Sequence, residues 1–170
     1  MYTFAVVTPN QKLLEWFSSR INPKHGFMVF DPELTRCTVL FDSNGQPIAA
    51  TAIDGWAESS CDMSVVSDGT KRWATPSFIC GTYEYIFDKC GMNRIAMLVA
   101  ADNKPAISMN RALGHVQEGL HRDYFGIGSD ALSFSYLRKD WEASKWYERT
   151  LREKNKNNEG DTTHGEEITT

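Results

Sequence analysis

The chain contains 170 residues, with a formal net charge of −4 and 41% hydrophobic residues. This length suits one domain that can bury a sizeable core, and the composition excludes collagen-like, rod-like and wholly disordered chains. The acidic balance argues against nucleic-acid binding, and no apolar run approaches the roughly 18 residues of a membrane span.

The first half of the chain predicts four strands and one helix. Thr8 and Pro9 are typical of a helix start, as an N-cap residue followed by a proline at the first helical position. Asn44-Gly45 between two apolar, β-branched runs indicates a hairpin turn. The predicted strands of this half are residues 2–7, 36–42, 47–53 and 61–66.

The second half predicts three helices and three strands. Thr75 caps one helix that Gly91 ends, and Asp102 or Asn103 caps another that Gly114 ends. The order β-α-β-β-β-α-β-α-β-β-α indicates an α/β fold, with helices crossing between the central strands of one mixed sheet. The predicted strands of this half are residues 94–100, 115–124 and 130–138.

The C-terminal segment differs from the rest in composition. Asp140 is expected to cap a last helix. Residues 153–170 carry five acids and two lysines, and Ile168 is their only sizeable aliphatic side chain. Burial therefore cannot offset the entropy of ordering them. We expect a folded domain over residues 1–152 and a disordered acidic tail over 153–170, for which a role as a partner-binding arm is the less favoured alternative.

Several site types are excluded by the absence of their motifs. The four cysteines and four histidines are scattered without a C-x-x-C pair, so we expect reduced, mostly buried thiols and no metal site. Nucleotide-binding glycine loops and the serine-hydrolase elbow are absent as well. The first residues lack the features of a signal peptide, so we expect a cytoplasmic protein.

One stretch of the second half combines three recognisable elements. A helix end reads Gly-x-x-Arg before a buried strand, an Asn opens a helix that ends Leu-Gly, and the next strand carries an acidic-Gly-x-x-Arg-Asp-Tyr element. The residues are Gly91, Arg94, Asn103, Leu113, Gly114, Glu118, Gly119, Arg122, Asp123 and Tyr124. This stretch resembles the GNAT superfamily of acyl-CoA N-acyltransferases, and within it the branch of ribosomal-protein N-terminal acetyltransferases.

The resemblance implies a mostly antiparallel twisted sheet, flanked by helices, whose central strands four and five (61–66 and 94–100) splay apart to hold acetyl-CoA. It further implies that the pantetheine arm pairs with the backbone of strand four. The pyrophosphate would lie on N–H groups of the next loop and helix N-terminus. The implied cofactor-binding residues are Ser64, Val65, Val66, Lys71, Arg72, Trp73, Ala74, Thr75, Ser77 and Asn103.

The loop expected to bind phosphate departs from the family pattern, Gln/Arg-x-x-Gly-x-Gly/Ala. Without a gap, Trp73 stands at the first glycine, and a second alignment frame also lacks glycine. Pro76 removes one N–H group. Lys71 and Arg72 offer positive charge in compensation. The alternative is a solvated turn that no longer holds CoA, and the sequence leaves both interpretations open.

The expected catalytic position also departs from the family. Many GNAT enzymes carry a general-acid Tyr five residues before the helix's final aromatic, and these two positions are Asn110 and His115 here. An Asn cannot act as an acid, but its amide can donate a hydrogen bond to a thiolate. Ser108 is a second polar candidate, although a solvated helix position explains it more simply. Asp54 and Glu58 are interpreted as solvated loop acids.

We therefore expect an N-acetyltransferase that moves an acetyl group from acetyl-CoA to the amine of a protein N-terminus, a lysine or a small molecule. It would act as a monomer or homodimer, without a nucleic-acid or membrane partner. The alternative is a catalytically degenerate GNAT-fold structural or interaction protein, such as a tailed-phage virion component. Trp56, Trp73 and the acidic tail would then be contact features.

Overall fold

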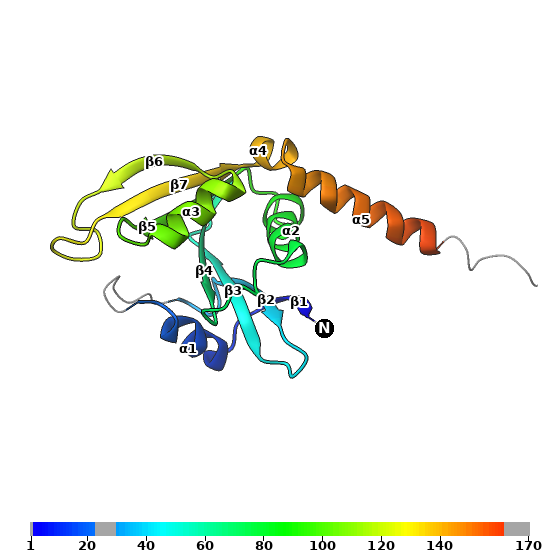
Figure 1. Cartoon of the computed structure of the whole chain (residues 1–170), viewed down its shortest axis with the longest axis horizontal. Coiled ribbons are helices and arrows are strands. Elements are labelled where there is room, and N and C mark those ends of the chain that lie inside the picture. Colours follow the sequence, from blue (N-terminus) through cyan, green and yellow to red (C-terminus); the bar gives the residue numbers. More distant parts are fainter. Residues whose placement is uncertain (1, 23–29, 162–170) are drawn as a thin grey trace, which may run out of the picture.

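The computed structural model describes residues 2–22 and 30–161, which form helices around one sheet (Figure 1). The predicted order of elements is confirmed, with a π-helical segment and a short helix added. The elements are β1 (Thr3–Val7), α1 (Gln11–Ser19), β2 (Arg36–Phe41), β3 (Pro47–Asp54), β4 (Ser60–Ser67), α2 (Pro76–Glu84), η2 (Tyr85–Lys89), β5 (Arg94–Ala100), α3 (Lys104–Leu113), β6 (Val116–His121), β7 (Ala131–Leu137), α4 (Arg138–Glu142) and α5 (Lys145–Asp161).

Within the described residues the sheet has seven strands in the order β1-β2-β3-β4-β5-β7-β6, and only β4 and β5 pair in parallel. Their pairing covers three positions, from Ser60–Arg94 to Asp62–Ala96. Beyond these positions β4 and β5 continue unpaired with each other, so the two strands splay. The expected antiparallel sheet with splayed strands four and five is confirmed.

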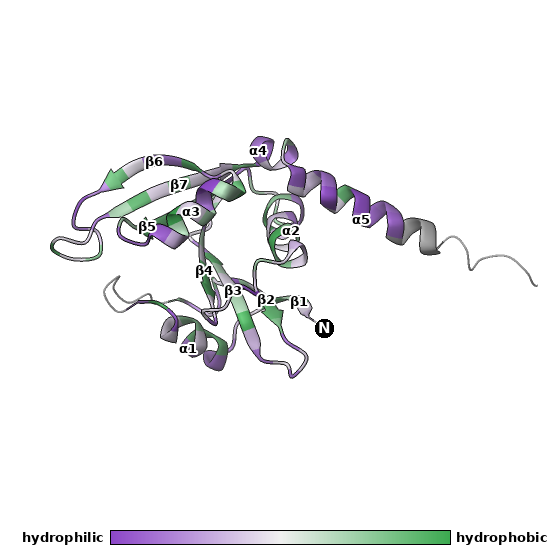
Figure 2. Ribbon diagram, in the orientation of Figure 1, coloured by the Kyte–Doolittle hydropathy of each residue, from purple (hydrophilic) through white to green (hydrophobic). Residues whose placement is uncertain are grey.

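Helices cover both faces of the sheet, as the alternation of side chains on β2 shows. Cys37 and Val39 pack in a buried cluster with Phe17 of α1. Thr38 lies between them and points to the opposite face. There its Oγ1 lies 2.8 Å from Oγ1 of Thr82 on α2. The first half of the sheet is therefore packed between α1 and α2, and Figure 2 shows apolar residues on these strands and on α2.

Local sequence signals set most helix ends. Thr75 caps α2 and Asn103 caps α3, each accepting a backbone N–H three residues on. Gly114 ends α3 in the left-handed conformation, with φ of +95°. The expected cap of α1 at Thr8 is wrong, because the side chain of Asn10 makes that bond at 2.9 Å and the helix starts after it.

The resemblance residues Arg94, Glu118 and Asp123 have structural partners. The guanidinium of Arg94 on β5 bonds the carboxylate of Glu118 on β6, and Ser135 of β7 donates to the same carboxylate at 2.8 Å. Asp123, with φ of +55°, accepts the N–H of Gly128 and so closes the loop between β6 and β7. Arg94 and Glu118 thus join β5 to β6 across β7, and Asp123 shapes the loop.

The C-terminal helix is broken where the sequence predicted one continuous helix. Asp140 does not cap it: α4 ends at Glu142, and α5 begins at Lys145. Ser144 lies at the break, and its Oγ accepts the N–H of Tyr147 at 3.2 Å. A serine cap inside the segment therefore starts a new helix.

The expected disorder does not describe residues 153–161, where α5 continues and projects from the body (Figure 1). Lys154 Nζ lies 2.9 Å from a carboxylate oxygen of Glu84 on α2, and Arg149 pairs with Glu153 one turn along α5. Such pairs support a polar helix. The remainder of the expected tail, 162–170, lies outside the described residues. No described helix is both long and apolar enough to cross a membrane.

Candidate functional site

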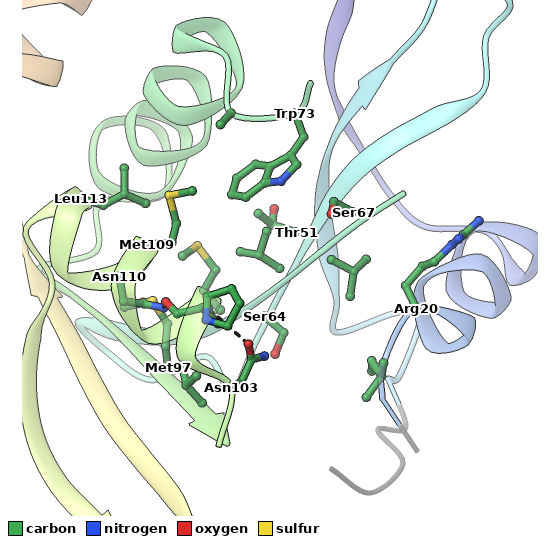
Figure 3. A pocket seen from close by; sticks show the side chains of 18 of the residues that line it. Arg20, Thr51, Ser64, Ser67, Trp73, Met97, Asn103, Met109, Asn110 and Leu113 are labelled. Atoms are coloured by element: carbon green, nitrogen blue, oxygen red, sulfur yellow. Dashed lines mark hydrogen bonds between the residues drawn. The ribbon is translucent and has the colours of Figure 1, made fainter. Parts of the chain in front are cut away.

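A cavity of about 860 Å³ opens where β4 and β5 part (Figure 3). Its walls come from β4, β5, α1, α2, α3 and the segment between β4 and α2. The volume lies within the roughly 300–1,000 Å³ usual for ligand sites. The sequence-predicted residues that line it are Ser64, Val65, Val66, Lys71, Trp73, Ala74, Asn103 and Asn110.

Four sequence-predicted residues are not among the residues that line this cavity. The guanidinium of Arg72 instead bonds the carboxylate of Asp68 at 2.8 Å. Thr75 Oγ1 caps α2 and lies 3.1 Å from Ser77 Oγ. Ser108 is exposed on α3. The structure therefore does not bring these four side chains to the site.

The β4 wall presents a strand edge to the cavity. After Asp62 the edge of β4 that faces β5 has no pairing from that strand, within the residues the structure describes. Val65 is 42% exposed there, although it sits in a central strand. An extended ligand can therefore bond the β4 backbone as an added strand would and cover this valine.

Positive charge lines the cavity. Among the described residues its charged lining side chains are Arg20 on α1 and Lys71 after β4, and no Asp or Glu lines it. Most of the remaining wall is apolar, including Trp73, whose ring meets that of Phe78 edge-on. The cavity is therefore suited to a long ligand with apolar and anionic parts.

The segment between β4 and α2 already satisfies most of its own N–H groups. Five of the seven residues from Gly69 to Thr75 donate their N–H to acceptors within residues 67–73. Asp68 is central, because Thr70 and Arg72 both donate to its carboxylate. Slight burial opposes ionisation, but these hydrogen bonds prevail and lower the pKa of Asp68. The N–H groups that the resemblance implies for a pyrophosphate are therefore largely bonded within the chain.

A hydrogen-bonded chain of three side chains lies at the α3 wall. Oδ1 of Asn110 is 2.6 Å from Nδ1 of His115, and Nε2 of that ring is 2.6 Å from Oη of Tyr83. All three line the cavity, and Figure 3 shows Asn110 beside Met97. Burial lowers the pKa of His115 to about 4 and raises that of Tyr83 well above its usual range.

Sequence reasoning missed His115, the ring that bonds Asn110, and Tyr83, which bonds the other nitrogen of that ring. It placed His115 at the start of a strand, whereas the ring is buried directly after the α3 cap. Tyr83 lies 32 positions before His115 in the sequence, so no local pattern joins the two residues. The available signal was local: a His one residue after a C-capping Gly folds back toward the residue five positions earlier.

Two acids lie where β4 and β5 begin to part, but neither lines the cavity. Asp54 and Asp62 are partners across β3 and β4. Burial and then the neighbouring carboxylate raise the pKa of Asp54, and burial, opposed by Arg94, raises that of Asp62. Asp54 is therefore a half-buried strand residue, not the expected solvated loop acid. Glu58 is exposed as expected.

No protein-family model and no curated protein matches this sequence. Solved structures do match. The spermidine/spermine N-acetyltransferase SpeG from Vibrio cholerae with manganese ions has a TM-score of 0.64 at 14% identity, over 84% of this chain and 94% of that one. The same organism's spermidine N-acetyltransferase with CoA and spermine has 0.63 at 15%, over 81% and 97%. A single-site mutant of SpeG has 0.67 at 16%, over 85% and 96%.

These likenesses extend over most of each chain. At this level of identity they establish the fold alone. The chain has the GNAT fold of the N-acetyltransferases.

Proposed function

We propose that this chain is an N-acetyltransferase that binds acetyl-CoA in the cavity between β4 and β5. The observation that carries the proposal is the end of the β4–β5 pairing at Asp62, which opens a lined cavity beside a strand edge. A solved protein of the same fold holds CoA. The motif resemblance points to the same chemistry, and to the ribosomal-protein branch of the family.

The lining residues have distinct roles in this proposal. The β4 edge near Val65 pairs with the pantetheine arm, and a backbone N–H of β4 polarises the thioester carbonyl. Lys71 lines the cavity from the segment between β4 and α2, and its positive charge binds the phosphates. The amine attacks the carbonyl carbon, the C–S bond breaks, and the amine proton leaves to a base or water. An N–H of Asn110 stabilises the departing thiolate.

The charge of the cavity bears on the acceptor. A polyamine carries several positive charges, and a site built for one places carboxylates around it. Arg20 and Lys71 line this cavity instead, with no acid among its described lining residues. We therefore propose an acceptor with a single amine, either a protein N-terminus or lysine or a small monoamine, although the solved neighbours are named for spermidine.

A transfer assay tests this function. The full chain is incubated with acetyl-CoA and, separately, with a peptide bearing a free N-terminus, an N-blocked lysine peptide, a small monoamine and spermine. Free CoA and acetylated product are measured by thiol titration and mass spectrometry. We expect product with at least one monoamine or peptide and less with spermine. No product with any of them refutes the enzymatic proposal.

One observation favours a second candidate, a GNAT-fold binding module without catalysis. The donors of the segment that leads to α2 are already engaged by Asp68 and its neighbours. With these donors engaged, the pyrophosphate has few N–H groups to bind. Absence of acetyl-CoA binding together with an intact fold would favour this candidate.

A further inference from the structure

The hydrogen bonds that link the side chains of Tyr83, His115 and Asn110 determine which of their polar atoms carry hydrogens. Nδ2 of Asn110 is 2.8 Å from the carbonyl oxygen of Ala106, one turn earlier on α3. A carbonyl oxygen only accepts, so this atom of the amide must be the nitrogen. The oxygen of the same amide then faces Nδ1 of His115 at 2.6 Å, and that ring nitrogen must carry a hydrogen.

The protonation state of Nε2, the other ring nitrogen of His115, follows from the burial of the ring. The ring is 6% exposed, and burial holds its pKa at about 4, so it is neutral near pH 7. With the hydrogen on Nδ1, Nε2 is bare and accepts the hydroxyl hydrogen of Tyr83 at 2.6 Å. Donation therefore runs in one direction, from Tyr83 to His115 to Asn110.

The backbone places the ring for this task. Gly114 adopts φ of +95°, a conformation that side chains disfavour, and turns the chain back on α3. The N–H of His115 then bonds the carbonyl of Asn110 at 3.0 Å, in parallel with the side-chain bond. Two bonds thus tie the ring to the Asn it orients.

We propose that His115, held by Tyr83, is a positioning residue that keeps the Asn110 amide with its oxygen turned away and an N–H available to the cavity. An amide nitrogen has two hydrogens, and only one is used by Ala106. The second is the donor that the departing CoA thiolate needs, whereas a flipped amide would offer an oxygen and repel it. This inference rests on the proposed acetyl transfer.

The hydrogen positions are tested without activity. The full chain is labelled with ¹⁵N-histidine, and the ring nitrogens are observed by NMR near pH 7. Comparison with His115→Phe identifies the signals of His115. We expect a single neutral form with its hydrogen on Nδ1. A hydrogen on Nε2, or a charged ring, overturns the proposal.

Kinetics test the positioning role with a matched pair of variants. His115→Phe and His115→Asn both remove the acceptor of Tyr83, but the Asn amide keeps a donor near the Nδ1 position. We expect His115→Phe to lower kcat by about tenfold or more, with the KM for acetyl-CoA within about twofold. His115→Asn should recover most of that loss. Equal losses in both variants overturn the proposal.

A variant with the same shape keeps the inference testable if replacement of the ring unfolds the chain. Asn110→Asp retains the oxygen that accepts from His115 and replaces the donor by a charge. We expect kcat to fall by about tenfold or more, and an unchanged kcat overturns the proposal. If the wild-type chain acetylates no amine, the proposed function fails, while the NMR result still decides the hydrogen positions.

Discussion

At the residue scale, Asp68 holds donors that the phosphates of the proposed acetyl-CoA ligand would need. Its carboxylate holds Thr70 and Arg72, so the charge of Arg72 is paired inside the segment, whereas Lys71 lines the cavity. We expect Asp68→Asn to tighten acetyl-CoA binding about three- to tenfold by removing a like charge and releasing donors. Isothermal titration calorimetry measures the change.

Asp42 offers the matched control for this substitution. It also holds a turn by accepting two backbone N–H groups, but it lies in the β2–β3 hairpin and does not line the cavity. Asp42→Asn should leave acetyl-CoA affinity unchanged. Equal affinities for wild type and Asp68→Asn would show that this carboxylate does not oppose the ligand.

Burial of His115 has a consequence for stability that depends on pH. The folded pKa is about 4, against an ordinary value near 6.5 in the unfolded chain. Between pH 4 and 6.5 the unfolded chain binds a proton at His115 that the folded chain does not. The contribution of neutral His115 to the free energy of unfolding is therefore fully present above pH 6.5 and is lost as pH falls toward 4. Wild type should lose up to about 3 kcal/mol more than His115→Phe over this range.

Urea unfolding at pH 7 and pH 4 measures this difference. His121, which is exposed in the structure, supplies the control variant His121→Phe, and its loss should match that of wild type. If His115→Phe also loses as much as wild type, the ring is not kept neutral by burial.

At the scale of elements, local chemistry explains what the sequence predicted. Strand periods and the Thr75, Asn103 and Gly114 caps depend on near neighbours, so these elements appear where expected. The π-helix η2 depends on distant contacts instead. Arg138 bonds the carbonyls of Phe87 and Met92, which lie some fifty residues earlier, and no local pattern contains that contact.

The first turns of helix α5 pack against the body of the protein, and its last residues are not needed for stability. Its first turns contact α2, where Cys80 Sγ donates to the carbonyl of Trp146 and Lys154 pairs with Glu84. A chain that ends at residue 156 should therefore keep its free energy of unfolding within about 0.5 kcal/mol. A chain that ends at residue 144 should lose several times more of its free energy of unfolding, because it lacks the residues that make these contacts.

Urea titration of the two truncated chains measures both values. A similar large loss in both would show that residues 157–170 stabilise the body. No loss in either would show that α5 as a whole is dispensable.

At the scale of the whole molecule, the sequence predicted the position of the cavity and part of its lining, but not the contacts of every lining residue. The β4–β5 parting followed from the motif resemblance, and eight of the predicted residues line the site. The roles of Arg72 and His115 did not follow from it. The role of Arg72 depends on a turn that closes around Asp68. The role of His115 depends on its contact with Tyr83 of α2, which the periodicity of the sequence does not predict.

The shared fold does not by itself decide between an enzyme and a binding module, because function depends on the site. The two candidates differ in one property, the ability of the cavity to take acetyl-CoA. Val65 allows this property to be removed selectively, since it is an exposed valine within the cavity wall. Val116 on β6 is similarly exposed and does not line the cavity.

The most direct measurement is thermal unfolding of wild type, Val65→Arg and Val116→Arg with increasing acetyl-CoA. We expect wild type and Val116→Arg to gain about 2.7 kcal/mol of stability at ~100 times the dissociation constant, and Val65→Arg to gain none. No shift for the wild-type chain at millimolar acetyl-CoA would contradict a CoA site between β4 and β5.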